Sequence, residues 1–566
     1  MNNIIENYEI PNIEKCIKQL NSIIYDISCC NDIKSEINLV YSFYDILKEI
    51  LSYNSIITAQ NLMNINSTNL TDRKYDFDKY LPEIQLLKKK LYKIIDNSKN
   101  KNALIDTLGE QYFKIIKNSL FKKLKPKYSS NISEDDLTNE YGKIIANSEI
   151  TINNISYSLS ELNILLLDKD IENRKIAYLE KLKFFSLNEK KINIILDSLI
   201  KLRADIAKYS GFNNYIDISY INMNRYDYTQ KDIRKFRKYI LNYVNPLITE
   251  IQEYQKKYLN TSHISNHNER YVFYDKIDIF SNKENFLSLM DKVFTDMSEE
   301  TKELFLLLKN NDLIDVESRK GKSPGAYSIY IENKNISFII TNNSGTYEDI
   351  LNFSHEFGHA LQRRLSGKYK IIEYSLPTME LGEVSSMTME LLIYPFIDKY
   401  LKEYSLKYKY NHMFQAILFL PYVAAIDEFQ EQIYSNLQLT IDERNILWQN
   451  IEKKYMPWRN YTEYEVKINS WQQQGHIIFS PFYYIDYALA QMTALEIWII
   501  SNNDRDKAWS KFINICKSGG SKSYLNTLKE NKLSNIFIEE NFKNIIEYIK
   551  TYMIKLGDQI ERSNKL

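Results

Sequence analysis

Apolar residues recur at three- and four-residue steps near the start of the chain. An α-helix turns once in about 3.6 residues, so this spacing gathers the apolar side chains on one face. The segment therefore predicts a helix that packs one side against a core. Its apolar positions are Ile13, Cys16, Ile17, Leu20, Ile24 and Ile27.

The pattern changes between residues 310 and 347. Two short runs alternate in polarity, SIYI at 328–331 and ISFII at 336–340, and the four residues ENKN join them. Glycine, proline, serine and asparagine gather around both runs, as they do in turns. We therefore predict a small antiparallel sheet here. The stretch NNISYSLSELN at 153–163 indicates instead a loop that enters a helix.

Composition favours helices in the rest of the chain. Its 566 residues include only 13 glycines and 10 prolines, which is few for a protein of many short strands. The most apolar stretch, MFQAILFLPYVAAI at 413–426, is too short to span a bilayer and contains Gln415 and Pro421. It predicts a buried helix. We expect a mostly α protein of more than one lobe.

Charge and cysteine content argue against several kinds of partner. The 73 basic residues balance 73 acidic ones, which leaves no net field to attract nucleic acid. The four cysteines include no CxxC pair and no disulfide-like spacing, which is typical of a reducing compartment. The first residues lack the basic start and apolar run of a signal peptide. We expect a cytoplasmic protein with no nucleic-acid or membrane partner, and its oligomeric state stays open.

The stretch FSHEFGHAL at 353–361 carries the first candidate chemistry. Thr346 and Asp349 form a T-x-x-D capping box before it, which predicts the start of a helix. Gly367 is placed to end that helix.

His355 and His359 lie one turn apart on the predicted helix and share a face. Both imidazoles can therefore reach one zinc ion, while Glu356 leans toward the open side of the metal as a general base. With only six histidines in the chain, a chance match to HExxH is a poor explanation. Two histidines packed in a core without a metal are the alternative.

A catalytic zinc site needs a third protein ligand. The apolar segment 378–394 contains Glu383 and Glu390, which are seven residues apart and hence on one helical face. Unpaired carboxylates are costly to bury, so these two need a cation. We assign Glu383 to the metal and Glu390 to the other ring N–H of a histidine ligand. A surface position is the alternative for Glu390.

The segment 475–491 holds candidates for binding a substrate carbonyl. We expect His476 in a loop, followed by a helix that Ser480 caps and that has Pro481 at its first position. Tyr484 and Tyr487 would share a face of that helix and could donate hydrogen bonds to one tetrahedral intermediate. Because the chain contains 45 tyrosines, composition alone makes this pair a weak signal.

Three segments together resemble the thimet oligopeptidase and oligoendopeptidase F family of zinc metallopeptidases: GTYEDILNFSHEFGHALQ, LGEVSSMTME and HIIFSPFYYIDYALAQ. The resemblance is strongest over residues 310–491. It implies one Zn²⁺ ion per chain, bound by His355, His359 and Glu383. It also implies that Glu356 is the general base and that the substrate carbonyl is bound by His476, Tyr484 and Tyr487.

The sequence departs from the family at one place. The interval from His476 to the tyrosine pair is one residue shorter than in the thimet-type members. The additional Tyr483 therefore leaves open which phenols contact substrate, and we rank Tyr487 before Tyr484 and Tyr484 before Tyr483.

The resemblance further implies a nearly all-helical, two-lobed ellipsoid with a deep substrate channel, a small antiparallel sheet at the channel wall and zinc at its floor. Members of the family cleave short peptides and exclude folded proteins. The strand at 336–343 would then offer an edge to an extended peptide. We divide the chain into an N-terminal helical segment, 1–190, and a catalytic zinc metallopeptidase domain, 191–566.

Three functions are compatible with these residues. A zinc-dependent oligoendopeptidase that cuts internal bonds of short peptides agrees with all three matched segments. A zinc carboxypeptidase or aminopeptidase would use the same HExxH chemistry. A peptide-binding scaffold with a structural zinc would leave Glu356 without a role, and structural sites usually fill the fourth position with Cys or His.

Overall fold

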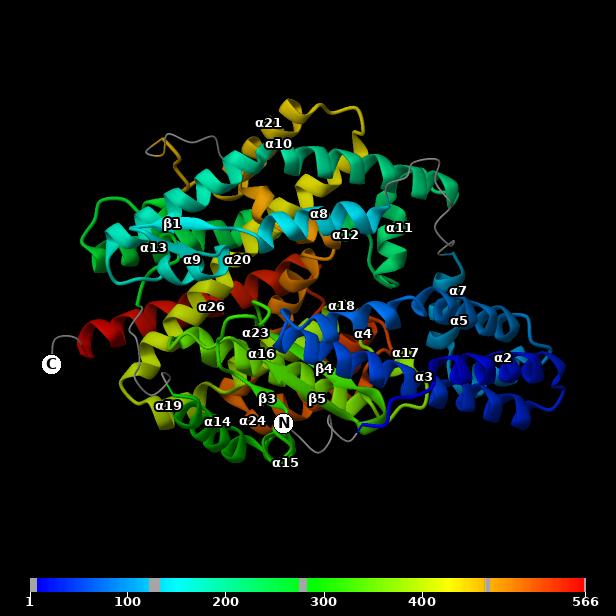
Figure 1. The fold of residues 1–566 in the computed structure, drawn as a ribbon. Coiled ribbons are helices and arrows are strands. Elements are labelled where there is room, and N and C mark those ends of the chain that lie inside the picture. Colours follow the sequence, from blue (N-terminus) through cyan, green and yellow to red (C-terminus); the bar gives the residue numbers. More distant parts are fainter. Residues whose placement is uncertain (1–7, 122–132, 274–281, 463, 465–468, 564–566) are drawn as a thin grey trace.

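The computed structural model describes residues 8–121, 133–273, 282–462, 464 and 469–563, and helices make up most of it (Figure 1). In the first half of the chain the elements are α2 (Ile13–Cys29), α3 (Ile33–Met63), α4 (Thr68–Asp78), α5 (Leu81–Asp96), α6 (Lys101–Leu108), α7 (Glu110–Phe121), α8 (Glu134–Ala146), β1 (Ile150–Ile152), β2 (Ile155–Tyr157), α9 (Leu159–Leu165), α10 (Ile171–Tyr209), α11 (Tyr215–Asn222), α12 (Gln230–Tyr239) and α13 (Asn245–Leu259).

The second half contains the larger sheet and the helices that pack around it. Its elements are α14 (Lys283–Met297), α15 (Glu299–Asn310), β3 (Ile314–Asp315), β4 (Tyr327–Ile331), β5 (Ile336–Ile340), α16 (Tyr347–Ser366), α17 (Ile372–Ser375), α18 (Met379–Leu392), α19 (Tyr394–Leu401), α20 (Tyr404–Ser435), α21 (Ile441–Tyr455), α22 (His476–Phe479), α23 (Ile485–Asn503), α24 (Arg505–Ser518), α25 (Tyr524–Glu530) and α26 (Glu539–Ser563).

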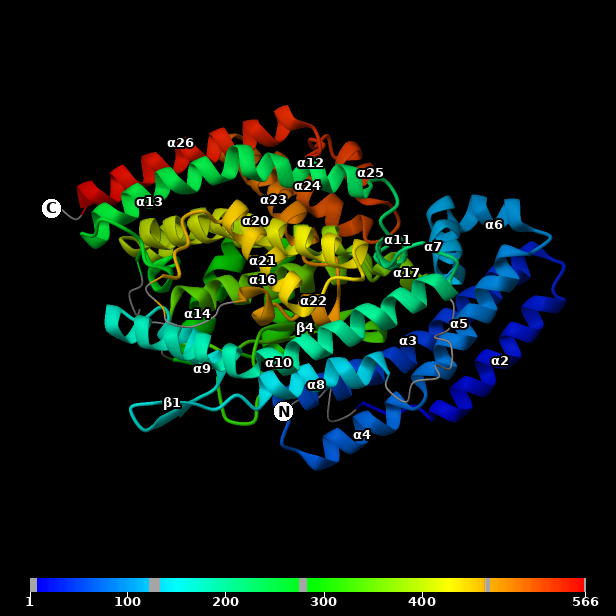
Figure 2. The same cartoon turned by 90° about the horizontal axis from the view of Figure 1, so that it is seen from above.

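The N-terminal helices form a core of their own. The six apolar positions predicted to share a face of α2 are all buried, so the predicted helix is confirmed. Asn12 caps it by accepting a hydrogen bond from the backbone N–H of Lys15 at 2.9 Å. Buried side chains of α2, α3, α5, α6 and α7 make one cluster with Phe77 of α4, and Ile371, Ile372 and Tyr374 at α17 also belong to it. Helices α2, α5, α6 and α7 gather at one end of the molecule (blue in Figures 1 and 2).

A second, larger core holds the rest of the chain together. Helix α10 crosses much of the molecule in Figure 2 and contributes Leu196, Leu199 and other apolar residues to this core. It continues without a break from Ile171 to Tyr209, through residue 190. The division of the chain at residue 190 stays a prediction.

The larger sheet confirms the predicted hairpin and adds a strand to it. Strands β4 and β5 are antiparallel, with Tyr327 opposite Ile340 and Ile331 opposite Ile336. The short β3 pairs with β5 in parallel, so the strand order is β3-β5-β4. Strand β5 is therefore central and all five of its residues are buried. The expectation that this strand offers a free edge is wrong at Ile339 and Ile340, because β4 pairs with one edge there and β3 with the other.

A second expectation about strands is also wrong. The Asn-rich stretch that begins at residue 153 does not enter a helix directly, because its first residues complete a two-stranded hairpin. Asn153 and Asn154 both have positive φ, 51° and 63°, which suits a tight hairpin turn between β1 and β2.

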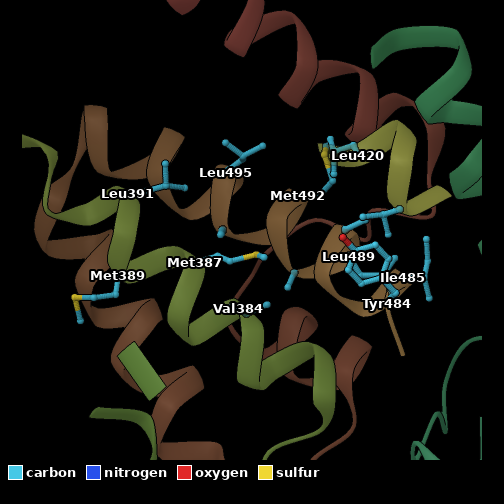
Figure 3. Close-up of a cluster of buried hydrophobic side chains, with 14 of the residues drawn as sticks. Val384, Met387, Met389, Leu391, Leu420, Tyr484, Ile485, Leu489, Met492 and Leu495 are labelled. Carbon is cyan, nitrogen blue, oxygen red and sulfur yellow. The ribbon is translucent and has the colours of Figure 1, made fainter. Parts of the chain in front are cut away.

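Helices stack outward from the larger sheet in the order α16, α18 and α23. Helix α16 packs on β4 and β5, α18 packs on α16, and α23 packs on α18. Figure 3 shows the apolar contact between α18 and α23, where Val384 and Met387 face Leu489 and Met492. The predicted buried helix at 413–426 is confirmed as part of α20. In the described ranges, no helix is long and apolar enough to cross a membrane.

Candidate active site

Helix α16 begins where the capping box predicts. The side chains of Thr346 and Asp349 each accept a hydrogen bond from the other's backbone N–H, and the helix ends with Gly367 as its C-terminal cap. Asp349 also accepts backbone N–H bonds from Ser344 and Gly345 at 2.8 Å each. Burial nevertheless raises the pKa of its carboxyl to about 6, against the lowering effect of these bonds.

Helices α16 and α18 bring three side chains together that could hold a metal ion. One ligand atom from each of His355, His359 and Glu383 lies within 4.8 Å of the other two. Glu383 Oε2 is 3.4 Å from His355 Nε2 and 3.5 Å from His359 Nε2. Two imidazole nitrogens and one carboxylate oxygen are a donor set that suits zinc and leaves a fourth position for water or substrate. These residues therefore fit the ion that the sequence predicts.

Glu390 lies behind the histidines, on the same face of α18 as Glu383. Its Oε1 is 2.7 Å from His355 Nδ1, so it can accept that N–H and leave the Nε2 lone pair free for a metal. Its Oε2 is 2.8 Å from His412 Nε2, and His412 Nδ1 is 2.8 Å from the Tyr394 hydroxyl. The contact expected of Glu390 is present, and its surface position is excluded because the side chain is only 13 % exposed.

The pKa values of Glu383 and Glu356, two carboxylates beside the histidines, are shifted in opposite directions. Burial would raise the pKa of Glu383, but His359 and His355 outweigh it and hold that pKa well below its ordinary value. Burial dominates at Glu356, so its pKa is raised despite the opposing effect of the same histidines. A metal ligand is expected to stay ionised, and a general base is expected to have raised basicity. The opposite pKa shifts of Glu383 and Glu356 agree with these two roles.

The segment after residue 475 differs from its prediction. His476 is the first residue of the short helix α22 and does not lie in a loop. Ser480 ends α22, and the next helix, α23, begins at Ile485 after Tyr484 as its N-terminal cap. Pro481 therefore lies between two helices. The cause is Phe482, whose φ of 69° is in the left-handed region and interrupts any continuous helix there.

Buried polar groups hold Phe482 in that conformation. Its backbone N–H donates to Gln430 Oε1 at 2.9 Å, and its carbonyl accepts from Arg225 at 2.6 Å. Arg225 also bonds to Asp486 at the start of α23 at 2.5 Å. The turn is therefore fixed from two sides, and it brings the neighbouring tyrosines toward His476.

The three tyrosines face different partners. The Tyr483 hydroxyl donates to Glu383 Oε1 at 2.7 Å, so it bonds to a predicted metal ligand. Tyr484 and Tyr487 line the cavity described below, and their rings lie 4.8 and 5.7 Å from that of His476. The structure thus brings together His476, Tyr484 and Tyr487, as expected.

His476 has the tautomer of a hydrogen-bond donor toward the cavity. Gln474 Nε2 lies 2.6 Å from His476 Nδ1 and donates to it, which leaves the ring proton on Nε2. Burial lowers the pKa of His476, so the ring is neutral over the physiological range. A neutral N–H in a cavity can bind a carbonyl oxygen.

Several of these groups line one cavity of about 760 Å³, among them Glu390, Tyr484 and Tyr487. Its walls come from both sides of the molecule, with α10 on one side and α16 and α18 on the other (Figure 1). His355, Glu356 and His476 lie on its wall. The volume suits a short segment of extended chain and excludes a folded domain.

Comparison with known proteins identifies the family. The sequence profile described as "Peptidase family M3" matches residues 164–543, and that of "Peptidase M3 N-terminal domain" matches residues 6–121. The chain belongs to peptidase family M3. This agrees with the resemblance to oligoendopeptidase F that the three motif segments carry.

Relatives and solved structures agree with family M3. An oligoendopeptidase F homolog of Borreliella burgdorferi is 24% identical over 396 residues, which cover 67% of this chain and 64% of the relative. The oligopeptidase PepF of Bacillus subtilis is 25% identical over 228 residues, 39% of this chain and 33% of that protein. The alignments thus span less than two thirds of these relatives' own lengths. The structure of PZ peptidase A with an inhibitor has a TM-score of 0.90 at 30% identity and covers 98% of this chain and 99% of its own.

Sequence reasoning missed two polar residues at this M3 site. His412 touches Glu390 from α20, and Gln474 touches His476 from the preceding loop. The signal for His412 was a histidine at the edge of the most apolar stretch of the chain, where a polar side chain needs a buried partner. No comparable signal marks Gln474.

Proposed function

We propose that this chain is a zinc-dependent oligoendopeptidase, a hydrolase that cleaves internal bonds of short peptides. One observation carries the proposal: the ligand atoms of His355, His359 and Glu383 converge within 4.8 Å, and His355 lines the large cavity. Glu356, on the same helix, lines that cavity too. Membership of family M3 supports peptidase chemistry at this position.

His355, His359 and Glu383 would hold the metal. A zinc ion held there supplies Lewis-acid chemistry: it polarises a carbonyl and lowers the pKa of a water molecule toward about 7. Glu383 stays ionised among the histidines, which suits a ligand. Glu390 fixes the His355 ring by accepting its Nδ1–H at 2.7 Å.

Glu356 acts as the general base. Burial raises its pKa, so it takes a proton from the attacking water more readily than an exposed carboxylate would. The protonated side chain then gives that proton to the leaving amine. A carboxylate on the metal-binding helix is well placed for both transfers, because it does not need to serve as a ligand.

An imidazole N–H group and two phenol O–H groups stabilise the negative charge that develops on the substrate carbonyl oxygen. His476 presents a neutral Nε2–H, since Gln474 occupies its Nδ1. Tyr484 and Tyr487 add phenol donors from the same wall of the cavity. Their raised pKa values, caused mainly by burial, keep both phenols protonated.

The proposal is tested with an internally quenched peptide of about eight residues that is blocked at both ends. An endopeptidase cuts it internally, loses activity with a chelator and regains it with Zn²⁺. Cleavage of free-ended peptides alone would favour the zinc carboxypeptidase or aminopeptidase. Binding of zinc and peptide without any turnover would favour the scaffold, and both results would overturn the proposal.

A further inference from the structure

The turn between α11 and α12 contacts the turn that carries the site tyrosines. Arg225 Nη2 donates to the Phe482 carbonyl at 2.6 Å and to Asp486 Oδ1 at 2.5 Å. The side chains of Arg225 and Asp486 are both fully buried. Because Tyr483 and Tyr484 lie between Phe482 and Asp486 in the chain, Arg225 binds the chain on both sides of these two tyrosines.

Tyr228 connects the same turn to helix α18. Its hydroxyl donates to Glu380 Oε1 and lies 3.4 Å from Asp486 Oδ1. Glu380 is buried in the first turn of α18 and precedes the candidate metal ligand Glu383 by nearly one helical turn. One hydroxyl group therefore contacts both the start of α23 and the helix that carries Glu383.

The turn that holds Arg225 and Tyr228 has a third anchor. Asp227 Oδ2 accepts the backbone N–H groups of Leu525 at 2.8 Å and of Asn526 at 3.3 Å, in the first turn of α25. Residues 225–228 thus contact α18, α23 and α25. These contacts with three helices fix the position of the turn.

The backbone at Phe482 needs such support. Its φ of 69° lies in the left-handed region, which a residue with a side chain adopts only when its surroundings hold it there. Arg225 holds the carbonyl and Gln430 holds the N–H. If Phe482 relaxed to a negative φ, the chain after it would change direction and the tyrosines would move with it.

Stability alone does not account for charged groups at this place. Burial of an ion pair removes two charges from water, and packed apolar side chains of similar volume are often at least as stable. A buried pair is better explained where it fixes one arrangement of the chain. The arrangement fixed here is that of the phenols around Glu383, since Tyr483 donates to it at 2.7 Å and Tyr487 interacts with it as well.

We propose that Arg225 and Tyr228 are positioning residues for the peptidase reaction. They hold the start of α23 against α18 and so place the phenol of Tyr487, the residue after Asp486, where it meets the substrate carbonyl oxygen. The inference rests on the proposed peptidase function and adds two residues to it. Neither of the two is among the described residues that line the cavity, so they act through Tyr487.

The test measures steady-state cleavage of the doubly blocked, quenched peptide by Tyr228→Phe and Arg225→Lys. Tyr228→Phe removes only a hydroxyl group and keeps the ring, whose centroid lies 5.2 Å from that of Phe537. Arg225→Lys keeps the charge beside Asp486 but loses the planar set of donors. Each variant should lower kcat about 10- to 100-fold, as expected when a catalytic group is misplaced by about 1 Å. KM and zinc content should stay close to the wild-type values.

Two controls carry the same substitutions outside these contacts. Tyr44→Phe, in the N-terminal core, removes a buried hydroxyl group that lies 2.7 Å from the Tyr112 hydroxyl. Arg237→Lys changes another buried guanidinium group, which pairs with Asp427 at 3.0 Å. Both controls should keep the wild-type kcat. Thermal unfolding of all four variants identifies a temperature at which each is folded, and Tyr228→Phe decides the result if Arg225→Lys does not fold.

A double-mutant cycle separates positioning of Tyr487 from a general effect on the fold. If Tyr228 acts through this phenol, Tyr228→Phe should lower kcat by no more than about threefold in the Tyr487→Phe background. A general structural defect would lower kcat by the same factor in both backgrounds, and that result would overturn the proposal.

Two failures can be told apart. If the wild type does not cleave the peptide, the proposed peptidase function fails and the positioning role fails with it. If the wild type cleaves it and the kcat of Tyr228→Phe stays within about twofold of that of Tyr44→Phe, only the positioning role is overturned.

Discussion

A single carboxylate contacts two histidines behind the three candidate metal ligands. Glu390 bonds to His355 Nδ1 through one oxygen and to His412 Nε2 through the other. Burial would raise its pKa, but these two histidines outweigh burial and lower it. His412 therefore orients Glu390, and Glu390 in turn orients the predicted ligand His355.

Replacing His412 tests this chain of contacts. His412→Phe keeps an aromatic ring but removes the donor to Glu390, so we expect the zinc dissociation constant to rise about 10- to 100-fold. The affinity can be measured by competition with a chromogenic chelator. His263→Phe is the matched control, because His263 is an exposed histidine outside the site. Equal zinc affinity in the two variants would contradict a positioning role for His412.

The tyrosines that the sequence could not rank have separable roles. Tyr483 donates a hydrogen bond to Glu383 at 2.7 Å, whereas Tyr487 lines the cavity and interacts with Glu383 as well. Tyr483→Phe should weaken zinc binding. Tyr487→Phe should weaken zinc binding less than Tyr483→Phe does and lower kcat by about 10- to 10³-fold, the range for loss of one donor to an oxyanion. Zinc titration and steady-state kinetics on both variants measure the two effects. A loss of kcat mainly in Tyr483→Phe and a loss of zinc affinity mainly in Tyr487→Phe would contradict these roles.

Residue identities at the site were largely predictable, because spacing alone carries the information. His355 and His359 are one turn apart on a helix whose capping box can be recognised in the sequence. Glu383 and Glu390 share one face of α18. Partners that lie far away in the chain, such as His412 and Gln474, were not predictable, since only the packing of α20 and of the loop before α22 brings them in.

At the scale of elements, α16 and α18 cross at unusually close range. A Cβ added to Gly358 would lie 2.6 Å from the Ser385 carbonyl oxygen and 2.7 Å from Ser386 Cα. The absence of a side chain at Gly358 therefore lets the histidine helix approach the glutamate helix. This distance decides whether Glu383 can reach both histidines.

Gly358→Ala is expected to destabilise the protein by about 1–3 kcal/mol and to weaken zinc binding, because the backbones must separate to admit a methyl group. Gly→Ala inside a helix normally stabilises by up to about 1 kcal/mol. Gly142→Ala in α8 is the control, as its added Cβ would meet only Phe479 at 3.9 Å. Denaturant unfolding and zinc titration measure both effects. An equal response of the two variants would rule out the close approach as the cause.

Sequence patterns predicted helices and strands well where the element is determined by residues close to one another in the chain. The apolar stripe of α2, the cap of α16 and the hairpin of β4 and β5 depend on neighbours in sequence. The start of α23 does not. It depends on Arg225 and Gln430, which hold Phe482 in a left-handed conformation that no local signal indicates.

Two further failures concern strands. Strand β3 has only two residues and exists because it pairs with β5 at a distance in sequence, so no local pattern could reveal it or the central position of β5. The hairpin of β1 and β2 did have a signal, because consecutive asparagines between alternating residues are typical of a tight hairpin turn.

At the scale of the whole molecule, the cavity is lined by helices that are distant in the chain, such as α10 and α16. Arg203 of α10 illustrates how they are joined, since it donates to the carbonyl of Ile478 at the site and bonds to Glu134 of α8 at 2.9 Å. Arg203 is fully buried, so these bonds also satisfy its charge. Such contacts join α10 to the short helix that carries His476, and sequence patterns contain no information about them.

Metal binding should stabilise the whole molecule. An ion that binds only the folded chain adds about 4 kcal/mol to the free energy of unfolding at a thousandfold excess over its Kd. We therefore expect added zinc to raise the Tm of metal-free protein by several degrees, as measured by calorimetry. His355→Ala should abolish most of this shift. A shift of the same size in His355→Ala would show that the ion binds elsewhere.

The role of Glu356 is tested by measuring turnover and zinc content in the same preparations of wild type and Glu356→Gln. We predict one zinc per chain in both proteins and a loss of peptide cleavage by several orders of magnitude in the variant, because the variant keeps all three proposed ligands and loses the base. Wild-type turnover in Glu356→Gln at full zinc occupancy would contradict a zinc peptidase with Glu356 as its base.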